Sequence, residues 1–220
     1  MPNPIIHVIA IDGPAGAGKS TIGKALAKQL GLEYLDTGAM YRAVTFAALS
    51  ADLPLDDVAA IGALARAVRL EVGERGVFVD GIDATSAIRS PEITGAVSVV
   101  AANSEVRAEM RARQQAWAAE RGGGVIEGRD IGSVVFPDAE LKLYLTASPR
   151  TRAERRVAEA GGDVDEIERA IAARDHYDSN RSDSPLVRPD GSLVVDTTGM
   201  GIDEVLAHIE TLITTEAEHS

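Results

Sequence analysis

The chain of 220 residues contains no cysteine, which excludes disulfide bonds and thiolate metal ligands. No hydrophobic run approaches the roughly 20 residues that a membrane-spanning helix needs. No leader with a basic segment and then an apolar segment opens the sequence, so we expect a cytoplasmic protein with no membrane partner. None of the possible pairs among the four histidines has the spacing of metal ligands.

Lysine is also scarce. Only four of the 22 basic residues are lysines, so the other 18 are arginines. Arginine binds phosphates and carboxylates through two parallel hydrogen bonds, although biased codon usage gives the same excess. The net charge is −12, which argues against a nucleic acid as a partner. The arginines therefore matter only if they gather at a site.

One eight-residue segment predicts phosphate binding. It fits G-x-x-x-x-G-K-[ST] at every fixed position: Gly13, Pro14, Ala15, Gly16, Ala17, Gly18, Lys19 and Ser20. Backbone N–H groups of such a loop surround a phosphate chain, and glycines allow that close approach. Lys19 is expected to reach the β- and γ-phosphates of ATP, and Ser20 to bind Mg²⁺. An apolar strand at 5–11 and a helix at 21–30 provide the expected context.

The rest of the chain alternates between expected strands and helices, which predicts a parallel sheet covered on both faces. We expect a three-layer α/β/α fold with about five core strands. Residues 69–72 and 77–79 switch to a period of two around an Asp80-Gly81 turn, so they predict an inserted lobe. Two charged, apolar-poor helical segments flank Gly161-Gly162 and predict a lid. The expected single domain, 1–220, has a core at about 1–40, 98–150 and 185–220, a lobe at 41–97 and a lid at 151–184.

Three groups of residues are candidates for binding phosphates or a nucleoside. Arg174, Asp178 and Arg181 share one face of an expected helix, unless they form only an exposed ion pair. Gly128-Arg129-Asp130 follows a strand, where ligands bind in α/β proteins, although a turn with exposed charges has the same pattern. The segment from Asp36 to Arg42 follows another strand and also opens at that edge.

These blocks together resemble the bacterial cytidylate kinases, ATP-dependent kinases of the P-loop nucleoside-monophosphate kinase group. Beside the phosphate loop, the resemblance rests on segments 35–42, 128–139, 174–175 and 180–181, in order along nearly the whole chain. The D-[ST]-G-A-x-Y-R and G-R-D-x-G-[ST]-V-V-F-P-[DN]-A blocks are far more specific than the loop alone. Two features depart from the pattern: Thr37 stands where serine is common, and the lid is short.

The resemblance implies a role at each matching position. The loop from Gly13 to Thr21, with Arg155 of the lid, would hold ATP. The CMP site would comprise Asp36, Thr37, Arg42, Ser98, Arg107, Arg129, Asp130, Arg174, Asp178 and Arg181. Within it, Thr37 and Arg42 would bind the phosphate, whereas Ser98, Arg107 and Asp130 would recognise cytosine. Asp178 would bind the ribose. The catalytic residues would be Lys19, Arg129, Asp130 and Arg174.

The expected activity is therefore phosphorylation of CMP and dCMP by ATP and Mg²⁺, in pyrimidine metabolism, by a monomer. A kinase of the same fold that acts on AMP, UMP or a small metabolite is the nearest alternative. A nucleotide-dependent switch is a second alternative, but the chain has no Asn-Lys-x-Asp segment to recognise guanine. An arginine set for an acceptor would also have no purpose in a switch.

Overall fold

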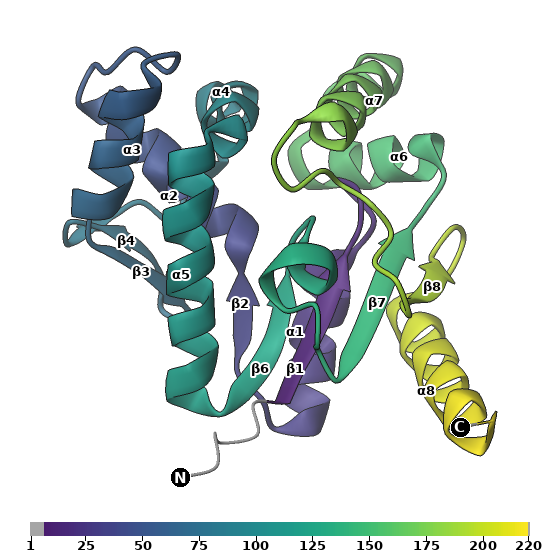
Figure 1. The fold of residues 1–220 in the computed structure, drawn as a ribbon. Coiled ribbons are helices and arrows are strands. Elements are labelled where there is room, and N and C mark those ends of the chain that lie inside the picture. Colours follow the sequence, from purple (N-terminus) through teal and green to yellow (C-terminus); the bar gives the residue numbers. More distant parts are fainter. Residues whose placement is uncertain (1–6, 220) are drawn as a thin grey trace, which may run out of the picture.

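The computed structural model describes residues 7–219, with the side chains of residues 7–215. A five-stranded parallel sheet lies at its centre, in the order β2-β6-β1-β7-β8 (Figure 1). These strands are β1 (His7–Asp12), β2 (Tyr34–Asp36), β6 (Gly123–Glu127), β7 (Leu141–Thr146) and β8 (Leu193–Asp196). The predicted five-stranded parallel sheet is confirmed. The first two residues of the expected strand at 5–11 lie outside the described part of the chain.

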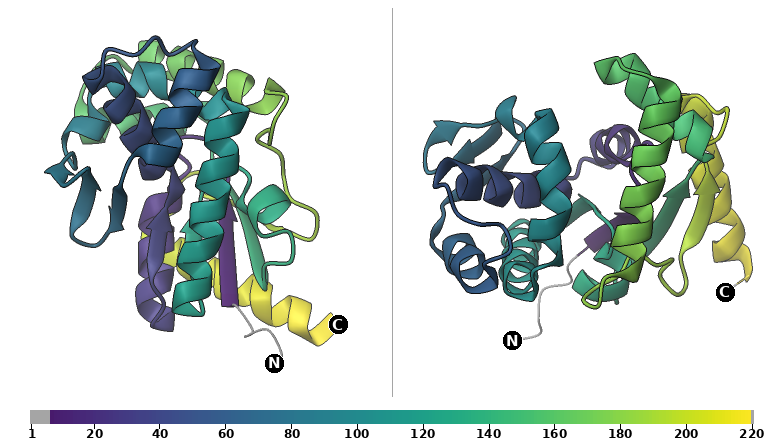
Figure 2. Two further views of the ribbon diagram at one scale, coloured as in Figure 1. Left: turned by 60° about the vertical axis from the view of Figure 1, so that its left-hand side comes forward. Right: turned by 90° about the horizontal axis from the view of Figure 1, so that it is seen from above.

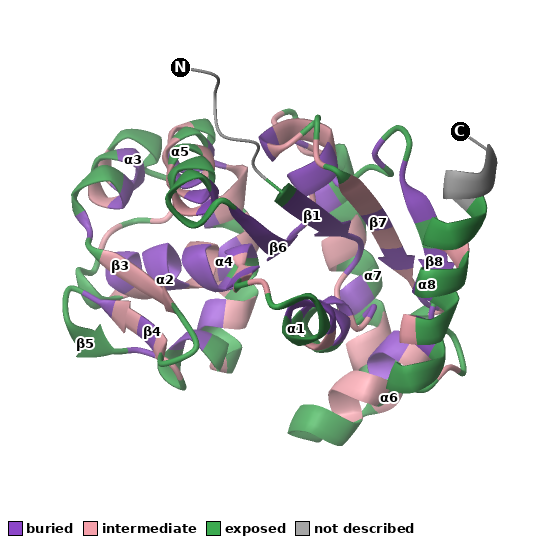
Figure 3. Ribbon diagram, turned by 90° about the horizontal axis from the view of Figure 1, so that it is seen from below, coloured by how far each residue is buried: buried purple, intermediate pink, exposed green. Residues whose placement is uncertain are grey.

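Each face of the sheet has its own apolar core because side chains alternate along a strand. In β1, Val8 and Ala10 join the core beneath α2 (Thr37–Ser50) and α5 (Ser104–Arg121). Ile9 and Ile11 join the core beneath α1 (Lys19–Leu30) and α8 (Ile202–His219). Both faces are thus covered, and the central strands are buried (Figure 3).

The expected lobe folds around a small antiparallel sheet, β3-β4-β5, which packs on α2. Asp80 and Gly81 both have positive φ, 49° and 82°, and form the predicted turn. Ser90 caps the following helix by accepting a hydrogen bond from the Ile93 N–H. After α2, this region forms α3 (Val58–Ala67), β3 (Leu70–Gly73), β4 (Gly76–Val79), β5 (Ile82–Asp83), the 3-10 helix Ala87–Arg89 and α4 (Pro91–Ala102), so the expected lobe boundary at residue 97 falls inside α4.

The expected lid consists of α6 (Pro149–Ala160) and α7 (Val164–Asn180), which pack against each other. Few of their side chains are buried, as their charged sequence predicts. Figure 1 shows the strands pointing toward a region that has α4 on one side and α7 on the other. The view from above in Figure 2 shows the lobe and α6–α7 on opposite sides of α1 and β1. In the described part of the chain, no helix is long and apolar enough to cross a membrane.

Candidate active site

A cleft of about 1220 Å³ opens at the carboxyl edge of the sheet, between the lobe and α6–α7. Its walls carry eight arginines: Arg42, Arg89, Arg107, Arg129, Arg155, Arg156, Arg174 and Arg181. The protein as a whole has a net charge of −12, so this concentration of cations is local. Such a cleft attracts highly charged anions, as nucleotide phosphates are. The arginine excess therefore gathers at one site.

The phosphate loop takes its shape from backbone geometry that glycine permits. Gly13 has φ of 143°, and a Cβ atom there would lie 1.9 Å from the Leu145 carbonyl oxygen. Gly18, with φ of 87°, precedes α1. No acidic residue occupies the first turn of α1, so its N–H groups and its dipole are free to attract an anion. The loop is therefore suited to phosphate groups.

Lys19 lies inside this loop and is 8% exposed. Its Nζ donates a hydrogen bond to the Pro14 carbonyl oxygen at 2.8 Å. Burial, followed by the charge of Arg129, lowers the pKa of Lys19 to about 7. Bound phosphates would favour the charged ammonium, because their negative charge would add to that of the nearby Glu127 and Asp12 carboxyl groups.

Glu127, at the end of β6, is the main site residue that sequence analysis missed. Its Oε1 accepts hydrogen bonds from Ser20 Oγ at 2.6 Å and from the Tyr34 hydroxyl at 2.7 Å. Its Oε2 is buried, with no hydrogen-bond partner among the described residues. Burial raises the pKa of this carboxyl above its usual value. The sequence did carry one signal for Glu127, an acidic residue at the end of an apolar strand. The structure shows that this strand pairs with β1.

The residues around Ser20 fit a Mg²⁺ ion that arrives with a nucleotide. No group of three or more His, Cys, Asp or Glu among the described residues could hold a metal ion. Mg²⁺ in phosphoryl-transfer sites typically keeps several waters and takes one or two protein ligands beside the phosphates. The Ser20 hydroxyl and the unpartnered Glu127 Oε2 suit that role, the first as a ligand and the second as an acceptor for a metal-bound water.

The acceptor side of the cleft begins at α2. Thr37 is buried, and its Oγ1 donates to the Glu127 carbonyl oxygen at 2.6 Å. Arg42 donates from Nη1 to the Thr94 hydroxyl at 2.9 Å, and burial lowers the pKa of its guanidinium to about 10. Asp36 accepts the Ala39 N–H at 2.9 Å and thereby caps α2.

A second, more deeply buried set of charges lies between α5 and the end of β6. The Arg107 guanidinium donates to the Asp130 carboxylate, and the two residues are 2% and 5% exposed. Arg181 Nη2 lies 3.8 Å from the other Asp130 oxygen. Ser98 of α4 lines the same cleft. The group presents carboxylate acceptors next to guanidinium and hydroxyl donors, which suits the edge of a nucleobase.

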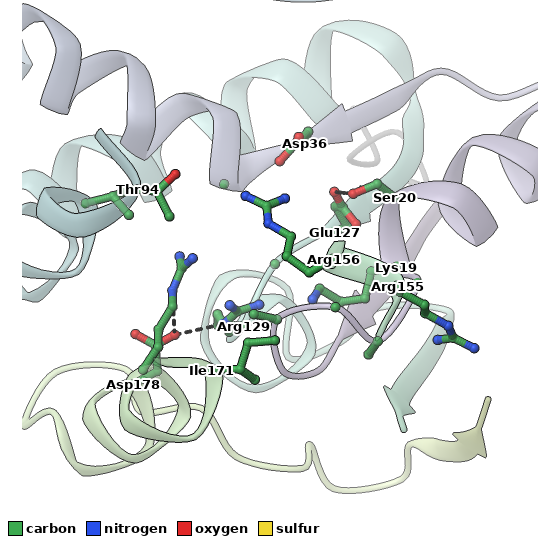
Figure 4. A pocket seen from close by; sticks show the side chains of 18 of the residues that line it. Lys19, Ser20, Asp36, Thr94, Glu127, Arg129, Arg155, Arg156, Ile171 and Asp178 are labelled. Carbon is green, nitrogen blue, oxygen red and sulfur yellow. Dashed lines mark hydrogen bonds and ion pairs between the residues drawn. The ribbon is translucent and has the colours of Figure 1, made fainter. Parts of the chain in front are cut away.

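Arg129 joins the phosphate loop to α7. It donates from Nη1 to the Gly13 carbonyl oxygen at 2.9 Å and from Nε to Asp178 Oδ2 at 3.0 Å. Arg174 Nε lies 3.9 Å from the same Asp178 oxygen, and burial lowers the pKa of Arg174 to about 10. Asp178 is 3% exposed, so this is not a solvated surface pair. Figure 4 shows the Arg129–Asp178 contact beside α7 and the Ser20–Glu127 bond beside the loop.

Comparison with known proteins places the chain in a family. A family model described as cytidylate kinase matches residues 9–215. The chain belongs to the cytidylate kinase family. It is 48% identical over 218 residues to a cytidylate kinase of Desulfitobacterium hafniense (strain Y51), covering 96% of this chain and 94% of the relative. It is 50% identical over 212 residues to that of Listeria monocytogenes serotype 4a (strain HCC23), covering 93% and 94%.

A solved structure shares the fold of this cytidylate kinase family member. A gluconokinase from Sinorhizobium meliloti 1021 aligns with a TM-score of 0.52 over 98% of each chain, at 16% identity. At that identity, the likeness concerns the fold alone. The expected three-layer α/β architecture is confirmed.

Nearly all of the residues expected in a cytidylate kinase site line the cleft. All ten expected CMP-site residues do so, from Asp36 to Arg181. On the donor side, residues 15–21 and Arg155 line it, but Gly13 and Pro14 do not. Those two instead accept hydrogen bonds through their carbonyl oxygens, from Arg129 and Lys19. Arg155 itself donates to the Thr197 carbonyl oxygen at 2.7 Å and is thus held at the end of β8. The individual roles stay predictions.

Proposed function

We propose that this protein transfers the γ-phosphoryl group of ATP to CMP and dCMP, giving ADP and CDP or dCDP, with Mg²⁺. One observation supports it above the others. A single cleft holds a phosphate loop on one wall and a buried Arg107–Asp130 pair on another, with Arg129 and Arg174 between them. The family match and the named relatives agree with this activity. One chain carries both nucleotide sites, so we keep the expectation of a monomer. We also keep the expectation of a cytoplasmic protein.

Phosphoryl transfer depends mainly on positioning and charge stabilisation, and this chain supplies both. Lys19 and the loop N–H groups hold the donor phosphates, and Arg42 with Thr37 holds the acceptor phosphate. Arg129 and Arg174 lie where the transferred group would pass. Mg²⁺ bound at Ser20 would neutralise charge on the β- and γ-phosphates. The acceptor phosphate is already ionised near neutral pH, so the site needs no general base, and no described histidine lines the cleft.

Recognition of cytosine follows from hydrogen-bond direction. The exocyclic amine of cytosine donates, and its N3 and O2 accept. An Asp130 carboxylate can accept from the amine while Arg107 or Ser98 donates to the ring acceptors. Uracil presents an acceptor where cytosine has the amine, so it would face the Asp130 carboxylate with a second acceptor.

The test measures ADP production with ATP, Mg²⁺ and each of CMP, dCMP, UMP, AMP and GMP. We expect turnover with CMP and dCMP, its loss in Lys19→Ala, and its loss in Asp130→Ala. Turnover with a different acceptor would retain phosphoryl transfer and reject the assignment of cytosine. ATP binding without dependence on any acceptor would favour a nucleotide-dependent switch.

A further inference from the structure

The start of the phosphate loop is hydrogen-bonded to the segment that carries Asp130. The Gly128 N–H donates to the Ile11 carbonyl oxygen at 2.9 Å, which continues the ladder between β6 and β1. Beyond the ladder, the two carboxylate oxygens of Asp12 accept the N–H groups of Ile131 and Gly132, each at 2.7 Å. The residue just before the donor loop is therefore joined directly to the two residues just after Asp130 of the acceptor site.

A carboxylate is an unusual choice for two hydrogen bonds that serve only to hold the backbone in place. Asp12 is fully buried, and among the described residues no cation lies within ion-pair distance of it, although the charge of Lys19 acts on it. Ionising a carboxyl in such a place is unfavourable, and burial raises the pKa of Asp12 to about 6. Its two hydrogen bonds, which lower the pKa, offset this only in part. A buried carboxylate that reduces stability is more often found where function needs it.

The position of the two N–H groups indicates what Asp12 holds. Ile131 and Gly132 directly follow Asp130 and open a short π-helical segment, Ile131–Val135. Asp130 precedes that segment with φ of −144° and ψ of 23°, outside helical geometry. Its carboxylate meets Arg107 and Arg181. A shift of the backbone just after Asp130 would therefore move the carboxylate away from the guanidinium groups.

Asp12 directly precedes the phosphate loop. We propose that it is nevertheless a positioning residue for the other nucleotide, because it helps to place the group that recognises the base of CMP. Its two carboxylate oxygens hold the backbone after Asp130, and that backbone orients the carboxylate expected to face cytosine. An asparagine cannot do the same, since its amide has one acceptor oxygen and would turn an NH₂ group toward an N–H. This inference rests on the proposed function for the identity of the base.

The test is Asp12→Asn, with Asp175→Asn as its matched control. Asp175 is also a carboxylate that holds the phosphate loop, because its Oδ1 accepts the Ala15 N–H at 3.4 Å. It lies on the donor side, where its other oxygen meets Arg152. Each variant removes one carboxylate charge beside the loop, but only Asp12 touches the backbone that follows Asp130.

We expect Asp12→Asn to raise the KM for CMP at least tenfold and to leave the Kd for ATP, measured by calorimetry, within twofold. The preference for CMP over UMP should fall about tenfold. Asp175→Asn should have the opposite effect: the Kd for ATP should rise, and the preference for CMP over UMP should stay unchanged. An Asp12→Asn protein that loses ATP and CMP affinity equally, or keeps its CMP preference, overturns the inference.

A second measurement covers the case in which Asp12→Asn does not fold. In the wild-type protein, CMP binding should slow amide hydrogen exchange at Ile131 and Gly132 more than ATP binding does. Equal protection by both ligands overturns the inference. Failure of the proposed function is distinguishable, because the wild-type enzyme would then not phosphorylate CMP at all.

Discussion

The buried Arg107–Asp130 pair should stabilise this protein only as a pair. Arg107→Met leaves the Asp130 carboxylate with Arg181 at 3.8 Å as its remaining cation. Asp130→Asn leaves the Arg107 guanidinium with Asp183, also at 3.8 Å. Both residues are at least 95% buried, so each single variant retains a desolvated charge with a distant partner. Removing one member of such a pair typically reduces stability by about 3–5 kcal/mol, and the distant partners favour the lower end.

The double variant should be less damaging than the sum of the two single variants. With Arg107→Met and Asp130→Asn together, neither member of the pair remains as an isolated buried charge. We therefore expect about 3 kcal/mol of destabilisation from each single variant, and a coupling free energy of about 2–3 kcal/mol between them.

Urea unfolding at pH 7 would measure this cycle, with equal slopes in all four proteins as the condition for comparing them. All three variants should also lose activity with CMP, whatever their stability. Additivity of the two single effects within about 0.5 kcal/mol would refute the reasoning, because it would mean that the two side chains do not depend on each other.

Two further predictions concern Tyr34 and Asp12. Tyr34→Phe removes one of the two hydrogen-bond donors to Glu127 Oε1, so the Mg²⁺ concentration that gives the half-maximal rate should rise several-fold. The Kd for metal-free ATP, measured by calorimetry, should not change. An unchanged Mg²⁺ requirement would show that the Tyr34 hydroxyl has no part in metal binding. The pKa of Asp12 is raised from 3.8 to about 6, so the unfolded chain loses this proton first as the pH rises, and the free energy of unfolding falls. Between pH 4 and pH 7 this group should remove about 2 kcal/mol, a loss that Asp12→Asn abolishes in urea titrations at both pH values. Equal pH dependence in the two proteins would contradict the raised pKa.

Local sequence was enough for the features that depend on neighbouring residues. The phosphate loop depends on glycines at Gly13 and Gly18 within a short segment, and the Asp80-Gly81 turn depends on two adjacent residues. Alternation of apolar strands and helices was enough for a parallel sheet, because burial on both faces requires continuous apolar strands. The same patterns did not predict the π-helical segment after Asp130, which has no comparable sequence signal.

The sequence by itself determined the phosphate-binding loop, the fold class and the family, since each can be recognised from short segments read in order along the chain, without knowing which segments touch. Only the tertiary structure decided which side chains work together. Glu127 meets Ser20 across 107 positions, and Asp12 meets Ile131 across 119. Both contacts exist because β6 pairs with β1 in parallel, so that the ends of both strands meet at one edge. Strand order and register are properties of the whole sheet, and no local pattern in this sequence specifies them.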